Sequence, residues 1–157
     1  MSSARSRGEQ KVVELSIRSR FELLDLVHNA ASAVLREAGF DDDARFWLTV
    51  AIREAVNNAI KHGNRLDARK LVRVRFEVGR EELKVWVRDR GRGFEPNRLP
   101  SPLEADNLLK GGGRGVYFMR KFMDKVRYVC RSSGCNEVCM IKRLPRAGKG
   151  PEKEEKR

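Results

Sequence analysis

The sequence predicts one compact domain of the α/β class. Apolar residues recur at helical spacing in some segments and alternate at strand spacing in others. The length of 157 residues suits a single core and is too short for an additional dimerising or sensing domain. Apolar residues make up 40% and charged residues 36% of the chain, and the periodic placement of the apolar residues argues against disorder throughout.

Both ends of the chain are expected to be flexible tails. Residues 1–10 and 145–157 are polar and lack periodicity, which leaves residues 11–144 as the folded domain. The first tail lacks the apolar centre of a secretory signal, and no apolar run approaches the ~20 residues that cross a bilayer. We therefore expect a cytoplasmic protein.

The N-terminal part of the domain predicts a strand followed by a helix. Residues 11–17 alternate between apolar and polar side chains, as in a strand. Ser19 is expected to cap a helix that ends at Gly39, a residue typical of helix C-termini. His28 lies within this helix and has no partner motif, so we expect a surface or partly buried residue without a catalytic role.

Residues 41–62 predict a second helix. Its first turn holds three aspartates, which suit the positive end of the helix dipole. Apolar residues supply core contacts early in the helix, but Glu54, Asn58 and Lys61 then share one face at i, i+4 and i+7. A polar stripe thus begins where a core stripe would otherwise continue.

A hairpin is predicted next, from residues 71–78 and 83–87, which both alternate and are joined through Gly79. Continuing the alternation places Asp89 on the apolar face at the end of the second strand. An unpaired carboxylate is costly there, so Asp89 needs a buried donor or a ligand.

The rest of the domain predicts a long loop, a short helix and two strands. Residues 91–115 contain three prolines and have glycines at both ends, which is typical of a functional loop, with a lid at about residues 90–115. Periodicity then predicts a helix near residues 116–122 and strands near 125–131 and 137–144.

The polar stripe of the second helix has the chemistry of a magnesium nucleotide site. Mg²⁺ is usually held by one or two protein oxygens together with phosphates and water, and Asn58 can supply one such oxygen. Glu54, one turn away, can polarise a hydroxyl or water for attack on a phosphate, and Lys61 can meet phosphate charge. Taken alone, the segment fits an ordinary solvated helix face equally well.

Two glycine segments complete the pattern. Asp89 can accept a hydrogen bond from an exocyclic amino group such as that of adenine, while Gly91 and Gly93 let the loop pass close to the base. A surface turn is the alternative for this string, but the inward register of Asp89 favours a site. The segment Gly111-Gly112-Gly113-Arg114-Gly115 precedes a helix, where backbone amides can cradle phosphates; the alternative is a flexible linker.

These three segments resemble the N, G1 and G2 boxes of the GHKL (Bergerat-fold) ATPases and kinases, over roughly Val13 to Leu144. Within that superfamily the sequence is most similar to the small anti-sigma factor serine/threonine kinases. The similarity lies in the single-domain length, in Glu54-Ala-Val-Asn-Asn58-Ala-Ile and in the run from Gly113 to Asp124. It implies a two-layer sandwich with helices on one face of a mixed, mostly antiparallel sheet.

The resemblance also implies a role for each site residue. Glu54 would be the catalytic base, Asn58 the magnesium ligand and Asp89 the adenine contact. The remaining ATP-binding residues would be Lys61, Gly91, Gly93, Gly111, Gly113, Arg114 and Gly115. ATP and Mg²⁺ are the implied cofactors.

Other branches of the superfamily fit less well. Sensor histidine kinases usually have Asn or His at the position of Glu54 and need a phosphoacceptor domain that this length excludes. Gyrase-like and chaperone relatives keep the Glu but are far longer. The sequence departs from the pattern at Val116, where Leu is usual, and in its strong basic charge.

The expected function is that of an ATP-dependent serine/threonine kinase acting as an anti-sigma factor. By resemblance, it would bind a sigma factor and phosphorylate an anti-anti-sigma (STAS-type) partner, and it could form a homodimer as many relatives do. The alternative is a regulatory module that binds ATP or a partner without useful catalysis, because nucleotide boxes report binding more securely than phosphotransfer.

Nucleic-acid binding is a less favoured third function. It rests on the net charge of +12, of which the tails carry little, and no nucleic-acid motif accompanies that charge. The three cysteines, Cys130, Cys135 and Cys139, form no CxxC pair, so we expect buried or idle thiols instead of a zinc site.

Overall fold

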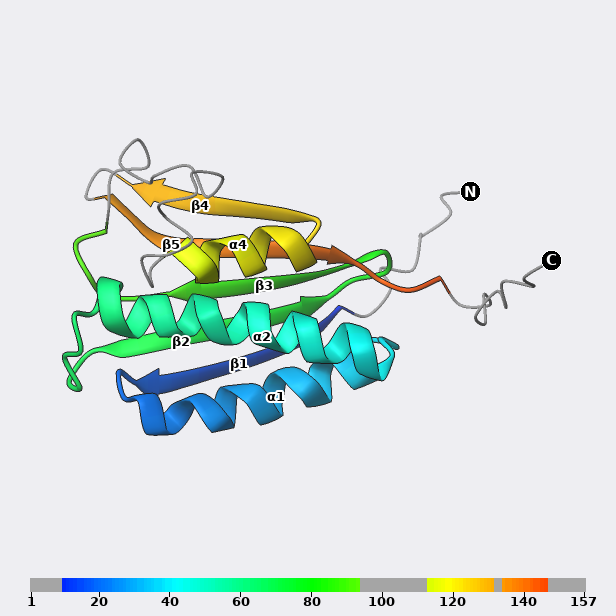
Figure 1. Cartoon of the computed structure of the whole chain (residues 1–157), viewed down its shortest axis with the longest axis horizontal. Coiled ribbons are helices and arrows are strands. Elements are labelled where there is room, and N and C mark those ends of the chain that lie inside the picture. The colour runs from blue at the N-terminus through cyan, green and yellow to red at the C-terminus, as the bar shows by residue number, and fades with distance from the viewer. Residues whose placement is uncertain (1–9, 94–112, 132–133, 147–157) are drawn as a thin grey trace, which may run out of the picture.

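The computed structural model describes residues 10–93, 113–131 and 134–146. Within these residues, three α-helices pack on one face of a five-stranded sheet, and no described helix covers the other face (Figure 1). The expected two-layer sandwich of helices on a sheet is confirmed.

The sheet has the strand order β1-β2-β3-β5-β4. Its strands are β1 (Lys11–Arg18), β2 (Leu71–Val78), β3 (Glu82–Arg88), β4 (Lys125–Arg131) and β5 (Gly134–Arg143). All four pairings between these strands are antiparallel, so the described part of a sheet expected to be mixed contains no parallel pair. The predicted β2–β3 hairpin is confirmed.

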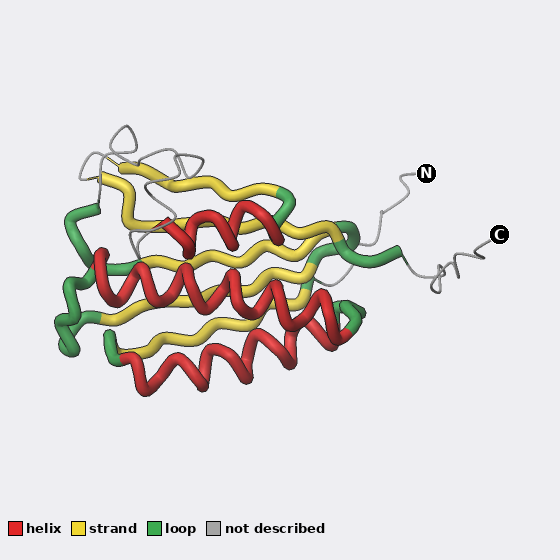
Figure 2. The backbone as a smooth tube through the Cα atoms, viewed as in Figure 1, coloured by secondary structure: helices red, strands yellow, loops and turns green. Residues whose placement is uncertain are grey.

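The helix layer contains α1 (Leu24–Glu37), α2 (Asp42–Asn58) and α4 (Gly113–Phe122). A 3-10 turn, η1 (Phe21–Leu23), precedes α1, and a π-helical turn, η2 (Ala59–Gly63), continues α2. Figure 2 shows the three α-helices lying along the direction of the strands. The predicted second helix therefore has the expected length, but its last turn is wound more loosely than an α-helix.

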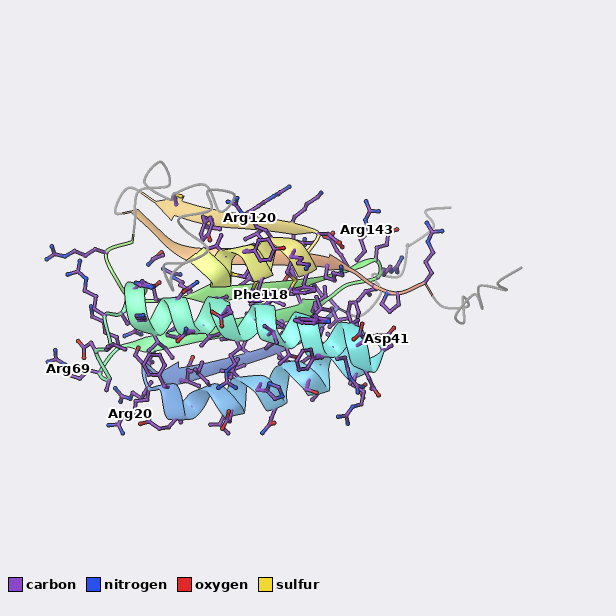
Figure 3. The ribbon with its side chains drawn as sticks, viewed as in Figure 1. Arg20, Asp41, Arg69, Phe118, Arg120 and Arg143 are labelled. Atoms are coloured by element: carbon purple, nitrogen blue, oxygen red, sulfur yellow. The ribbon has the colours of Figure 1, made fainter. Side chains whose placement is uncertain are left out.

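The junction between α1 and α2 follows from local chemistry. Gly39 has a φ of +85°, a backbone conformation that glycine adopts without strain, and it ends the first helix as predicted. Asp41 then caps α2, because its carboxylate accepts a hydrogen bond of 2.8 Å from the backbone N–H of Ala44. Figure 3 shows Asp41 at this end of α2.

The prediction that Ser19 caps the first helix is wrong. The 3-10 turn begins after Arg20, and no side chain caps it or α1. The Ser19 hydroxyl is instead buried and donates a hydrogen bond of 3.0 Å to the carbonyl oxygen of Lys70, just before β2. Ser19 therefore fastens the end of β1 to a neighbouring segment instead of starting a helix.

The core lies between the sheet and the helices and is formed by the inward residues of every layer. Its largest fully buried members are Phe76, Leu35, Leu48, Ile52, Ile60, Leu83, Met119 and Met140. An aromatic stack joins α2 to α4 at the edge of this core: the Trp47 and Phe122 rings lie 4.6 Å apart between centroids, at an interplanar angle of 10°. Phe118, labelled in Figure 3, stacks beside Phe122.

Candidate functional site

The C-terminal half of α2 presents Glu54 and Asn58 on a half-buried face, while Ala55 and Val56 between them are fully buried in the core. The four-residue spacing places the two polar side chains one turn apart on the same side of the helix. The core side of α2 thus anchors a carboxylate and an amide at fixed separation.

The start of α4 lies directly against this pair. A Cβ atom added to Gly115 would lie 2.8 Å from the Glu54 carboxylate oxygen Oε2 and 3.4 Å from the Asn58 side-chain nitrogen. A side chain at position 115 would therefore displace the Glu54 carboxylate from its present place. The first turn of α4, with its free backbone N–H groups and positive dipole end, is therefore held beside a carboxylate and an amide.

Asp89 lies just after β3, half-buried, as its strand register predicted. Its oxygen Oδ1 accepts a hydrogen bond of 2.7 Å from the Gly91 N–H, and no residue in the described ranges donates to Oδ2. The backbone of Asp89 is fixed from the other side, because its N–H donates to the Asn136 carbonyl oxygen at 3.0 Å and its own carbonyl oxygen accepts from the Asn136 side chain at 3.2 Å. One carboxylate oxygen is thus available to a ligand.

The pKa of Asp89 is raised above its usual value. Burial is the main cause, and it outweighs the Gly91 hydrogen bond and the positive charges of Lys70 and Arg88, which act in the opposite direction. A carboxyl group whose pKa is raised by burial at the end of a strand is typical of functional sites.

Two glycines let three backbone segments meet around Asp89. A Cβ atom on Gly63 would lie 2.1 Å from Asp89 Oδ2, and one on Gly91 would lie 2.1 Å from the Gly63 carbonyl oxygen. Neither position has room for any side chain. The end of η2, the Asp89 carboxylate and the glycine loop therefore pack closely against one another. We call this group of Gly63, Asp89 and Gly91 the Asp89 cluster.

Asn64 connects the segments around the Asp89 cluster by hydrogen bonds, a role that the sequence does not predict. It is fully buried, donates to the Ser19 hydroxyl at 2.7 Å and to the Leu71 carbonyl oxygen at 3.1 Å, and accepts from the Arg90 N–H at 2.8 Å. A polar residue directly after Gly63 is the available signal, but locally it indicates only the end of a helix. Its partners come from segments distant in sequence, so no local pattern identifies them.

The two groups of residues belong to one site because α2 and η2 join them. Glu54 and Gly63 are nine positions apart, which corresponds to roughly 13 Å along a helix at 1.5 Å per residue. The Asp89 end offers a hydrogen-bond acceptor and glycine surfaces for a flat base. The Glu54 end offers a carboxylate, an amide and a helix N-terminus, the last of which suits phosphate groups.

The remaining predicted site residues are placed less closely. Lys61 is exposed in η2 and makes no hydrogen bond or ion pair with a described residue, and Gly93 lies at the end of the described loop with a φ of +78°. Gly113 begins α4, and Arg114 follows it, but the Arg114 side chain, Gly111 and most of the predicted lid lie outside the described residues. The predicted tails also lie largely outside them.

A magnesium ion fits the donors of this site only in company with a nucleotide. The described residues contain no group of three or more His, Cys, Asp or Glu side chains arranged to hold a metal. Asn58 offers one amide oxygen, and Mg²⁺ commonly takes just one or two oxygens from protein when phosphates supply others. The donor set therefore suits a phosphate-bound ion.

The cysteines and His28 lie outside this site. Cys139 is a buried free thiol whose pKa burial raises to about 11, as expected of an idle thiol. Cys130 is exposed and disulfide-bonded, so the expectation of an idle thiol is wrong there. His28 is exposed on α1, as predicted.

None of the helices in the described ranges has the length and apolar character needed to span a membrane.

Comparison with known proteins identifies the family of the chain. Residues 17–142 match the model of the histidine kinase-like ATPase domain. The serine-protein kinase RsbW of Bacillus subtilis (strain 168) is 30% identical over 138 residues, which are 84% of this chain and 85% of that protein. The protein of the same name from Bacillus velezensis is 31% identical over 138 residues, with the same coverage of both chains. The one from Staphylococcus epidermidis is 27% identical over 143 residues, 87% of this chain and 89% of the relative.

Proposed function

The chain belongs to the histidine kinase-like ATPase domain family, and from this premise we propose that it is an ATP-dependent serine/threonine protein kinase. The observation that carries the proposal is the close approach of Gly115 to the side chains of Glu54 and Asn58. It places a helix N-terminus, suited to phosphate, beside a carboxylate suited to a hydroxyl group. Relatives named serine-protein kinase match most of the chain, which supports the same activity.

Each end of the site has a role in this proposal. Asp89 Oδ2 accepts a hydrogen bond from the adenine amino group, and Gly63 and Gly91 let the segments around this carboxylate pack closely. Asn58 would hold the magnesium ion that accompanies ATP through its amide oxygen, and the ion would supply neutralisation of phosphate charge. Gly93 lets the loop pass close to the base, and Gly111, Gly113, Arg114 and Gly115 shape the phosphate side, with Lys61 at its margin.

Glu54 is the proposed catalytic base. It orients the hydroxyl of a protein serine or threonine toward the terminal phosphate and accepts its proton as the new phosphate ester bond forms, while the bond from the γ-phosphorus to the bridging oxygen breaks and ADP leaves. Within the described residues its carboxylate has no hydrogen-bond or ion-pair partner, so the incoming hydroxyl can reach it. Placement of this group matters more than its basicity, because phosphoryl transfer depends mainly on positioning and charge stabilisation.

The proposed biological role is that of an anti-sigma factor. It rests on the resemblance of the N-box and of the run from Gly113 to Asp124 to the anti-sigma kinases. In this role the protein binds a sigma factor in the cytoplasm and phosphorylates an anti-anti-sigma (STAS-type) partner, with residues 11–144 as the ATP-binding domain. A homodimer is the proposed assembly.

The kinase proposal is tested with Glu54→Gln, which keeps the size and hydrogen bonding of the side chain but removes the base. Transfer of labelled phosphate from Mg-ATP to the anti-anti-sigma protein encoded by the same genome should fall by roughly 100-fold or more. ATP affinity should change little, because Glu54 lies at the opposite end from the base contact. Glu22→Gln, an exposed change on η1, is the matched control and should transfer phosphate normally.

Two results would contradict this assignment. Equal transfer by Glu54→Gln and by the unchanged protein would remove Glu54 from the base role. ATP binding without transfer to any partner in the unchanged protein, together with intact regulation by Glu54→Gln in cells, would favour the non-catalytic ATP-binding module instead.

A further inference from the structure

The face of the sheet that no described helix covers carries a hollow of about 650 Å³. We call it the open-face hollow, and its lining comes from β1, β2, β3 and β5. The charged and aromatic side chains of this lining include Arg73, Arg75, Arg88, Trp86, Glu14 and Glu77. The hollow lies on the side of the sheet opposite to α2 and α4, so it is separate from the proposed ATP site.

Two arginines in this hollow oppose each other without an anion between them. Arg73 on β2 and Arg88 on β3 are direct partners in the antiparallel register. Neither makes a hydrogen bond or ion pair with any residue in the described ranges. Like charges directly opposite in a sheet are unfavourable, so the pair gains stability from any anionic group that reaches both guanidinium groups.

Two carboxylates of the hollow, those of Glu14 and Glu77, are already engaged by Arg75. Glu14 and Glu77 both bind Arg75, each at 2.6 Å, and the Glu14 bond is the first cause of the raised pKa of Arg75. Glu137, which lies opposite Arg88 in the β3–β5 register, also takes part in an interaction. The positive charge of Arg73 and Arg88 is therefore left for another partner.

Trp86 gives the hollow an apolar wall and an unused donor. Its indole N–H is buried and has no acceptor within the described part of the chain. Its neighbour across the β3–β5 pairing, Cys139, faces the same side and is only 4% exposed, so this outward face has an apolar centre.

We propose that the open-face hollow binds a carboxylate-bearing segment of an acidic partner protein. Carboxylates of the segment pair with Arg73 and Arg88, and its apolar atoms cover the exposed part of Trp86. The net charge of +12 favours such a partner at long range. The carboxylates of Glu14, Glu77 and Glu137 at the rim disfavour a continuous polyanion such as nucleic acid, but they tolerate spaced carboxylates.

The test uses Trp86 as the reporter. Trp47→Phe leaves Trp86 as the sole tryptophan, because the chain contains two. The probe is a capped peptide of alternating Glu and Thr, about ten residues long so that it crosses the hollow at ~3.3 Å per residue. Binding of this Glu–Thr peptide should change the Trp86 fluorescence. A control peptide with Gln in place of every Glu, the Gln–Thr peptide, should produce no such change at the same concentrations.

Arginine variants in the Trp47→Phe background decide the location. Arg73→Gln should lower the affinity for the Glu–Thr peptide several-fold. The double variant Arg73→Gln with Arg88→Gln should lower that affinity by about tenfold or more. Arg36→Gln, an exposed change on α1 that removes the same charge, should stay within about twofold. Unchanged ATP affinity in Arg73→Gln would show that the fold and the opposite site are intact, which supports the proposal.

Several outcomes would overturn it. The proposal fails if the Glu–Thr peptide does not bind, or if Arg36→Gln weakens binding as much as the double arginine variant does. It also fails if inorganic phosphate produces the same Arg73-dependent signal at equal or lower concentration, since the site would then be one for small anions. Self-association of the unchanged protein that disappears in Arg73→Gln, seen by sedimentation, would assign the face to a second copy instead. None of these outcomes depends on kinase activity, so this proposal and the kinase proposal can fail separately.

Discussion

At the scale of the residue, Asp89 shows a conflict between stability and binding. Its carboxylate is held in a half-buried position with one bonded and one open oxygen, and burial raises its pKa. The folded state therefore binds the proton of this group more tightly than the unfolded chain does. At neutral pH burial of the Asp89 carboxylate therefore opposes folding, and the proposed contact with adenine would account for this residue.

We predict that Asp89→Asn stabilises the free protein and abolishes most ATP binding. Asn keeps the acceptor for Gly91 but carries no charge, so the free energy of unfolding should rise at neutral pH. The gain should fade as the pH falls below ~4, where the unfolded aspartate is protonated as well. ATP affinity should fall by about 10–100-fold. Urea unfolding at several pH values and calorimetric ATP titration measure the two effects, and a less stable variant at pH 7 would contradict the prediction.

Individual residues also show how much of the site could be predicted from the sequence. Alternation alone placed Asp89 correctly, because a strand's register continues to its end. Ser19 was misplaced, since its chemistry suits a helix cap locally while its actual partners are Asn64 and the Lys70 carbonyl oxygen. The role of Asn64 was invisible for the same reason. Local pattern determines side-chain direction, whereas pairing between distant segments depends on the assembled fold.

At the scale of the element, the junction of α2 with η2 was the least predictable part of the helix layer. Helical periodicity correctly predicted a helix to about residue 62, but a change to π-helical winding over Ala59–Gly63 is too short to alter an apolar pattern. Its effect on the site is direct: it brings Gly63 against Asp89 and leaves Lys61 exposed to solvent. The looser turn is typical of functional sites.

The contact between α2 and α4 leads to a second prediction. Trp47 stacks on Phe122 at 4.6 Å and near Phe118, so Trp47→Ala should lower the free energy of unfolding by about 2 kcal/mol or more. Because α4 also carries Gly115, phosphate transfer should fall as well. Leu26→Ala, at a side chain of α1 that is 56% exposed, is the control and should change stability by less than about 0.5 kcal/mol. Equal losses in both variants, measured by urea unfolding, would show that the stack has no special role.

At the scale of the whole molecule, ATP should stabilise the fold because its proposed site joins β3, η2, α2 and α4. A ligand that binds only the folded state at about 100 times its Kd adds ~2.7 kcal/mol, which raises the Tm of a domain of this size by about 5–10 °C. Mg-GTP should raise the Tm far less, since guanine presents a carbonyl oxygen where Asp89 needs a donor. Thermal unfolding with each nucleotide measures this, and equal shifts would argue against the Asp89 contact.

The order in which the strands pair has a consequence for synthesis of the protein. Strands β2 and β3 form a local hairpin, but β1 pairs with β2 across the whole of α1 and α2, with Lys11 opposite Val78. Asp89 is fixed only when β5 arrives, because its backbone hydrogen bonds go to Asn136. Long-range pairings form late in folding. We therefore expect a chain emerging from the ribosome to form α1, α2 and its first hairpin before the proposed nucleotide contact at Asp89 is in place, because that contact requires Asn136 to have been released.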